Sequence, residues 1–382
     1  MAKRKQRGNG EGSIYEHKRD GRKVGYRGAY TIYTASGPKR RYVSGKTREE
    51  ARLKLTKAMA DRDGGLVFED GGSSVGEYVE HWLRDSVRGT VRQSTYEAYE
   101  YMTYPHIVPS LGRVKLKALT PVHVRAFYRE KLDGGLSSAT VRKMHGVLQK
   151  ALDQAVSDGL IPRNAAKGIR LPQGKKKEIR PLSPDEARAL LAAARGDRLE
   201  ALYLLAISTG LREGELLALR WEDVDLEAAV LSVSRTLTRN SGKVAVGPPK
   251  TKNSRRTVGL TDGAIEALRG HLTRQLEEME RMGSLYRPGG LVFANEVGGI
   301  VNPSNLRNRS LKALLKRAEL PAIRFHDLRH TCATLLLSRN VNPKIVSEML
   351  GHASIAITLD TYSHVLPNMQ ESAVRALEEA LK

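Results

Sequence analysis

Four short polar motifs interrupt otherwise apolar, helix-forming sequence in the C-terminal half of the chain. The motifs are Ser-Thr-Gly-Leu-Arg212-Glu-Gly-Glu, His326-Asp-Leu-Arg329-His330, Leu-Gly-His352 and Asp-Thr-Tyr362-Ser-His. Two arginines and two histidines that converge, with a tyrosine nearby, would hold a phosphate group without a metal ion, because the planar guanidinium fork suits two phosphate oxygens at once. We therefore expect the helices of this half to fold so that these side chains meet.

The order Arg, His-x-x-Arg, His, Tyr resembles the tyrosine recombinase (phage integrase) family, from about Ser73 to the C-terminus. The resemblance implies a site-specific recombinase that integrates or excises a mobile element. It also implies a mainly α fold with small β-sheets. Its reaction joins a tyrosine to the 3′ phosphate of DNA, and no metal or other cofactor is implied.

The resemblance also implies the roles of the polar residues. Arg212 and Arg329 would hold the negative charge that builds on the phosphate oxygens, and His352 would donate a hydrogen bond to the same phosphate. His326 would accept a proton or position the phosphate, and His330 would be structural. Tyr362 would be the nucleophile, which requires help because tyrosine has a pKa of about 10.

A general acid must protonate the departing 5′ oxygen, and the family uses a lysine on a β-hairpin between the two arginine motifs. The segment Pro-Pro-Lys250-Thr-Lys252-Asn-Ser offers two lysines. Lys250 matches the pattern better, and Lys252 stays an alternative because hairpin register cannot be read from sequence.

His326 and His330 also have the spacing of two zinc ligands on one helix, so a metal-dependent hydrolase is an alternative. The motif has Asp327 where such enzymes carry glutamate, and the cationic Arg329 lies between the histidines. Cys332 is the only cysteine of the chain and cannot build a cysteine zinc site. We expect no metal, and we expect Cys332 to be an inert core residue.

The formal charge of +22 on 382 residues indicates a polyanionic partner, here double-stranded DNA with its attachment sites. The first 60 residues hold 17 Lys and Arg against 5 Asp and Glu, a net charge of 17 − 5 = +12. The sequence has no apolar run of about 18 residues, so no membrane segment is predicted. We expect a cytoplasmic, DNA-associated protein.

Three domains are predicted: residues 1–68, 74–170 and 180–382. The first combines three short strands with a helix that starts at Thr47-Arg-Glu-Glu50, and it resembles the arm-type DNA-binding domain of some integrases. We expect one face of its sheet to contact DNA through its basic residues Arg22, Lys23, Arg27, Lys39, Arg40 and Arg41.

The second domain is predicted to be helical throughout and resembles the core-binding domain of the family. Its expected phosphate contacts are Arg92, Arg142 and Lys143. The third is the catalytic domain. Family likeness implies a homotetramer on DNA, with an excisionase or a host DNA-bending protein as possible helpers.

Two other functions stay open at this point. A tyrosine-type DNA topoisomerase would share the chemistry, and a non-catalytic DNA-binding regulator would share the basic domains. The C-terminal helix, with Val374, Leu377 and Leu381, could pack on its own chain or on a neighbouring protomer.

Overall fold

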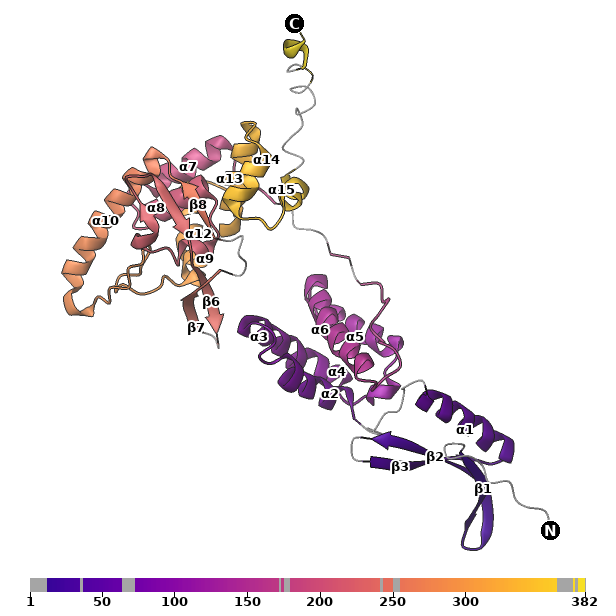
Figure 1. Ribbon diagram of the computed structural model, residues 1–382. Helices are drawn as coiled ribbons and strands as arrows, with labels where there is room; N and C mark the ends of the chain where they lie inside the picture. The colour runs from indigo at the N-terminus through magenta and orange to yellow at the C-terminus, as the bar shows by residue number, and fades with distance from the viewer. Residues whose placement is uncertain are drawn as a thin grey trace. The chain divides into compact units, whose positions relative to one another are not determined.

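The computed structural model describes residues 12–34, 37–63, 73–171, 173–174, 179–240, 243–249, 255–362, 374 and 377–381. The chain divides into two compact units, residues 1–175 and 176–382 (Figure 1). The first unit holds both a small sheet with one helix and a helical region. Residues 64–72, between these two parts, lie outside the described residues. The fold is mainly α with small sheets, as the sequence predicted.

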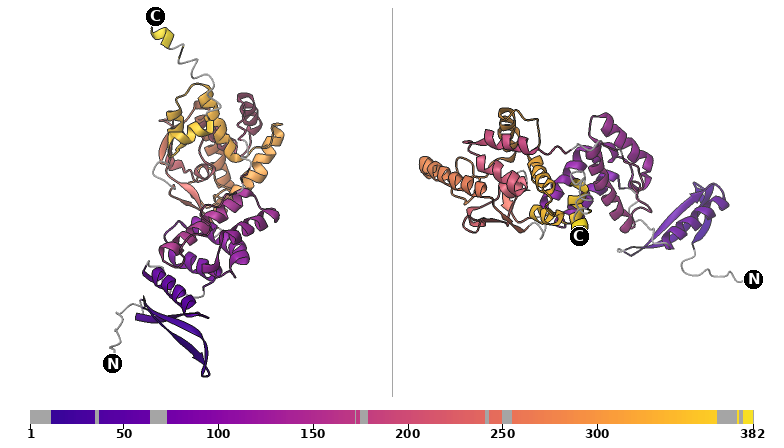
Figure 2. Two further views of the ribbon diagram at one scale, coloured as in Figure 1. Left: turned by 90° about the vertical axis from the view of Figure 1, so that its right-hand side faces the viewer. Right: turned by 90° about the horizontal axis from the view of Figure 1, so that it is seen from above.

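The N-terminal sheet is antiparallel with the order β1-β2-β3, and α1 packs against it (Figure 2). Asp20 and Gly21 connect the first two strands, both with positive φ, which is the conformation that an Asp-Gly hairpin turn requires. Thr47 Oγ1 accepts a hydrogen bond from Glu50 N at the predicted helix start. The elements are β1 (Ser13–Arg19), β2 (Arg22–Thr34), β3 (Gly37–Gly45) and α1 (Arg48–Asp63).

The predicted basic residues of this sheet do not share one face, and that expectation was wrong. Side chains alternate along a strand, and the pairs Gly28–Val43 and Thr31–Arg40 fix the register. A Cβ on Gly28 would touch Leu55 of α1, so this side faces the helix. Residues on the opposite side are Tyr15, Arg27, Arg40 and Tyr42, whereas Lys39 and Arg41 lie on the side of α1.

Helices of the first unit begin at hydroxyl side chains that act as N-caps. Ser74, Thr120 and Ser137 each accept a backbone N–H at the start of a helix. Two segments predicted as plain α-helix continue into wider π-helical turns, residues 82–87 and 103–107. The α-helices are α2 (Val75–His81), α3 (Gln93–Met102), α4 (Val108–Leu111), α5 (Pro121–Asp133) and α6 (Ser138–Ser157).

The second unit combines helices with a three-stranded sheet, β4-β5-β8, and a separate hairpin, β6-β7. Its helices are α7 (Pro184–Ala194), α8 (Glu200–Thr209), α9 (Glu213–Leu216), α10 (Asp262–Met282), α11 (Pro303–Asn305), α12 (Leu311–Arg317), α13 (Phe325–Ser338), α14 (Pro343–Leu350) and α15 (Ile355–Tyr362). Its strands are β4 (Val224–Asp225), β5 (Val230–Val233), β6 (Thr236–Asn240), β7 (Lys243–Gly247) and β8 (Arg256–Gly259).

Helix α8 lies at the centre of this unit and packs against α7, α10 and α13. It is apolar on all sides, which is the pattern of a helix surrounded by other elements, and Leu202, Tyr203 and Leu205 are fully buried. Its C-terminal end therefore presents the next residues at a fixed place in the interior. Within the described residues, every helix is too short or too polar to span a membrane.

Candidate active site

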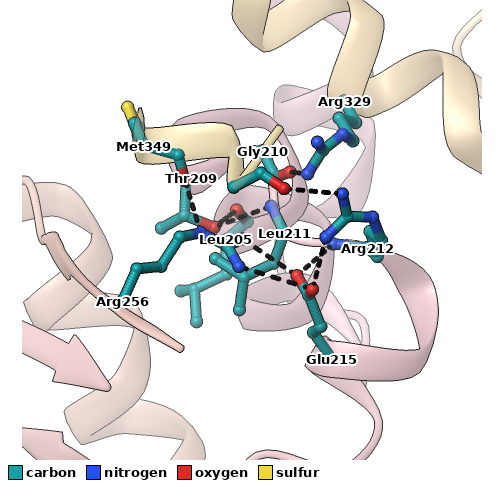
Figure 3. Close-up of polar contacts among 10 residues, drawn as sticks. Leu205, Thr209, Gly210, Leu211, Arg212, Glu215, Arg256, Arg329 and Met349 are labelled. Atoms are coloured by element: carbon teal, nitrogen blue, oxygen red, sulfur yellow. Dashed lines mark hydrogen bonds and ion pairs between the residues drawn. The ribbon is translucent and has the colours of Figure 1, made fainter. Parts of the chain in front are cut away.

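The first motif follows the end of α8, where Gly210 has φ +62°. A Cβ there would lie 2.5 Å from Leu350 Cδ2, so this left-handed turn excludes any side chain. Arg212 begins α9, and its Nη1 donates to Glu215 Oε1 at 2.7 Å (Figure 3). Its Nη2 donates to the carbonyl of Gly351 at 2.9 Å. Glu215 therefore holds Arg212 directly through an ion pair.

Arg329 projects from α13 towards the same turn and is 3% exposed. Its Nη1 donates to the carbonyl of Gly210 at 2.8 Å, while its buried Nη2 has no hydrogen-bond partner in the described part of the chain. Burial, together with the nearby charges of Arg212 and Arg256, lowers the pKa of this guanidinium to about 9.

A third arginine, Arg256 on β8, completes the cluster and was not predicted. Its Nη2 donates to Glu215 Oε2 at 2.9 Å and its Nε donates to the carbonyl of Met349 at 2.6 Å (Figure 3). A sequence signal existed, because Arg256 and the buried Val258 lie two residues apart on a strand and so share the face towards the core.

His352 follows α14, which ends at Gly351 with φ +67°, a left-handed glycine of the kind that commonly closes a helix. Its Nδ1 is hydrogen-bonded to Thr358 Oγ1 at 2.7 Å. Burial, with the charges of Arg329 and Arg212, lowers the pKa of its imidazole to about 4. Thr358, which fixes the ring, was not predicted.

Tyr362 is the last residue of α15 and is 2% exposed. It packs with buried apolar residues of α13 and α14, and its Oη lies 2.6 Å from His330 Nδ1. Burial raises the pKa of the phenol to about 12, although Arg329 opposes that shift. Burial also lowers the pKa of His330 to about 4. His330 was predicted to be structural, and this contact with Tyr362 was missed.

His326 lies one helical turn before His330 on α13, and the two rings meet edge to face with centroids 4.9 Å apart. Desolvation and the charge of Arg329 lower the pKa of His326. Asp327 is directed elsewhere, because both its oxygens accept hydrogen bonds from Arg324. The described residues contain no group of three His, Cys, Asp or Glu side chains that could hold a metal ion.

The structure thus brings Arg212, His326, Arg329, His352 and Tyr362 into one region of the second unit. Lys250 and Lys252 lie outside the described residues. Cys332 is buried, and burial raises the pKa of its thiol to about 12, as expected for a core residue. In the first unit, the predicted phosphate contacts Arg92, Arg142 and Lys143 are exposed.

Comparisons with known proteins identify the family of the chain. Residues 180–369 match a family model described as the phage integrase family, and residues 74–132 match the phage integrase N-terminal SAM-like domain. The chain is 35% identical over 354 residues to a protein named tyrosine recombinase XerC-like from Caldanaerobacter subterraneus subsp. tengcongensis, covering 88% of this chain and 90% of the relative. It is 30% identical over 391 residues to an integrase of Streptomyces ambofaciens, covering 98% and 97%.

Solved structures share the fold. The Tn1549 transposon integrase in complex with a circular intermediate DNA has a TM-score of 0.67 and 22% identity, covering 81% of this chain and all of that one. A lambda integrase tetramer bound to a Holliday junction has a TM-score of 0.56 and 19% identity, covering 93% and 96%.

The chain belongs to the tyrosine recombinase (phage integrase) family. It is an integrase that catalyses site-specific recombination.

Proposed function

We propose that the cluster in the second unit is the recombination active site, with Tyr362 as the nucleophile. Arg212, Arg329 and His352 bind the scissile phosphate, and His326 accepts a proton. Lys250 protonates the departing oxygen, with Lys252 as the alternative. Arg329 is the residue whose surroundings support this assignment most strongly.

The observation that carries the proposal is a surplus of buried positive charge. Three guanidinium groups, those of Arg212, Arg256 and Arg329, surround a single carboxylate, Glu215, which leaves 3 − 1 = +2 among these described groups. A buried charge without a counter-charge is costly, and Arg329 Nη2 also lacks a hydrogen bond. A bound phosphodiester would supply both the negative charge and the missing acceptor.

The reaction follows from these groups. Tyr362 Oη loses its proton and attacks the phosphorus, the bond from phosphorus to the 5′ oxygen breaks, and that oxygen takes a proton from the lysine. The arginines stabilise the charge on the non-bridging oxygens of the five-coordinate transition state. The product is a 3′-phosphotyrosyl bond, and attack by another 5′ hydroxyl reverses the step on a new partner strand without ATP.

The partners and the domain division are part of the proposal. Residues 1–68 bind arm-type DNA through the open face of the sheet, where Arg27 lies over the ring of Tyr42 at 5.1 Å. Residues 74–170 and 180–382 bind the core of the attachment site. Four protomers act together in the cytoplasm, with an excisionase or a host DNA-bending protein as helpers. The lambda relative solved as a tetramer on a Holliday junction supports this assembly.

The test is covalent capture on a nicked attachment-site DNA, from which the short fragment that carries the freed 5′ hydroxyl is lost. Tyr362→Phe is expected to bind this DNA normally and to form no covalent adduct. Tyr203→Phe is the matched control, because it also removes one hydroxyl from a buried tyrosine of the same unit, where it is hydrogen-bonded to Ser310. Covalent capture by the Tyr362 variant at the normal rate would remove the nucleophile assignment.

A further inference from the structure

Arg256 is buried next to the proposed phosphate-binding residues and is not itself one of them. Its side chain is 7% exposed, and its nitrogens contact protein atoms on two sides. On one side Nη2 and Nη1 approach the two oxygens of Glu215, at 2.9 and 3.4 Å, and on the other Nε donates to the carbonyl of Met349 at 2.6 Å. Arg256 is therefore directed into the protein, whereas the side chain of Arg212 is 37% exposed.

The contact with Glu215 controls how that carboxylate serves Arg212. Glu215 is 3% exposed and is shared between the two arginines. Its Oε1 accepts from Arg212 Nη1 at 2.7 Å, and its Oε2 accepts from Arg256 Nη2 at 2.9 Å and from the backbone N–H of Arg212 at 3.0 Å. A bidentate pair with a single arginine is the stronger geometry for a carboxylate. Because the guanidinium of Arg256 binds Oε2, the guanidinium of Arg212 binds Glu215 through Nη1 only. The Nη2 of Arg212 instead donates to the carbonyl of Gly351.

Arg256 and Arg212 both donate hydrogen bonds to the short segment Met349–Gly351. Met349 O accepts from Arg256, and Gly351 O accepts from Arg212, just before His352. A Cβ on Gly351 would lie 2.9 Å from Arg256 Nη1, so the turn and the arginine are in close contact. Arg256, on β8, thus links the start of α9, which carries Arg212, to the end of α14, which precedes His352 (Figure 3).

We propose that Arg256 is a positioning residue for phosphodiester cleavage, which fixes Arg212 and His352 relative to each other without touching the DNA. This inference rests on the active site proposed above. Without Arg256, Glu215 can turn both oxygens to the guanidinium of Arg212, and the segment before His352 loses the hydrogen bond at Met349 O. The guanidinium of Arg212 and the imidazole of His352 would then leave the geometry that the transition state needs.

The experiment compares Arg256→Met and Arg256→Lys with the wild-type protein in single-turnover covalent capture. Each protein is offered two nicked DNAs, one with a normal scissile phosphate and one with a methylphosphonate, in which a methyl group replaces a charged oxygen. Misplacing a charge-stabilising group by about 1 Å costs about 10²-fold in rate. The methylphosphonate develops less negative charge in the transition state and so depends less on the arginines. Its cleavage rate should therefore fall much less.

The expected result is therefore a fall in the rate ratio of phosphate to methylphosphonate by about 10²-fold for Arg256→Met, with unchanged DNA affinity. Arg256→Lys keeps the charge but has one ammonium group for two separate acceptors. Its rate ratio should therefore lie between those of the wild type and Arg256→Met. It also keeps the test valid if the methionine variant folds poorly. Arg198→Met is the control, because it removes a bidentate arginine–glutamate pair, with Glu278, elsewhere in the unit.

Two outcomes overturn the inference: equal losses on both substrates, which indicate a general folding defect, or no loss on either. Failure of the underlying site assignment gives a different result. In that case the wild-type adduct forms on a residue other than Tyr362, as peptide mapping of the adduct reports directly.

Discussion

Replacing Arg329 by methionine is expected to abolish DNA cleavage and to stabilise the DNA-free protein. The pKa of its guanidinium is about 9 in the fold against 12.5 as the ordinary value, a difference that corresponds to about 5 kcal/mol against folding while the group is charged. The loss of its hydrogen bond to Gly210 O offsets about 1.5–3 kcal/mol of this. The net expected gain is about 2–3.5 kcal/mol.

The sign follows from the direction of the pKa shift. The unfolded chain holds the proton of Arg329 more tightly than the fold does, so the cost is complete below about pH 9. It decreases only as the pH rises from about 9 towards 12.5. At pH 7 the whole difference should therefore be measurable, as a higher midpoint in urea unfolding followed by a signal from the second unit.

Arg324→Met is the matched control on the same helix, because it removes an exposed arginine that pairs with the buried Asp327. It should destabilise the protein, since Asp327 would lose its counter-charge. Inorganic phosphate should raise the urea midpoint of the wild type more than that of Arg329→Met. The reasoning is refuted if Arg329→Met is less stable than the wild type and both proteins respond equally to phosphate.

Two further predictions concern stability. Because burial lowers the pKa of His330 to about 4 against an ordinary 6.5, the unfolded chain binds this proton first and stability should fall as the pH falls from about 6.5 to about 4. His330→Gln should flatten that dependence in urea unfolding, and an unchanged slope would contradict it. Gly210→Ala should cost about 2–4 kcal/mol in urea unfolding, from the left-handed φ and the clash with Leu350. Gly270→Ala, at an open position in α10, should be neutral or stabilising, so equal losses in the two variants would count against the steric argument.

The parts of the site that could be predicted are those with a local signal. Ser183 and Pro184 mark the start of α7, and Gly351 marks the end of α14, because caps and left-handed turns depend on a few neighbouring residues. Arg212 and Arg329 belong to polar motifs that interrupt apolar, helix-forming sequence, so these two charged residues are easily recognised. These signals were enough to predict the helices and to expect that the side chains of the polar motifs lie close together.

The parts that were missed depend on contacts between distant segments. Strand alternation places Arg256 on the same face as Val258, but its pairing with Glu215, 41 residues earlier, has no local signal in the sequence. His330 and Tyr362 meet across 32 residues, and α15 between His352 and Tyr362 has too little helical periodicity to be predicted from eight residues. The two-sided division of the basic residues in the N-terminal sheet required only strand alternation, and it could have been predicted.

Carbonyl groups explain how the fold holds its cations without neutralising them. The three acceptors Gly210 O, Met349 O and Gly351 O lie at the C-terminal ends of α8 and α14, where helix carbonyls lack intrahelical partners and carry partial negative charge. An arginine that donates there satisfies an otherwise unpaired acceptor and is held in place. A carboxylate at each of these points would fix the arginines equally well, but it would cancel the charge that a phosphate needs. With one carboxylate and three carbonyls, the guanidinium groups are both oriented and still cationic, which is the condition that charge stabilisation in the transition state requires.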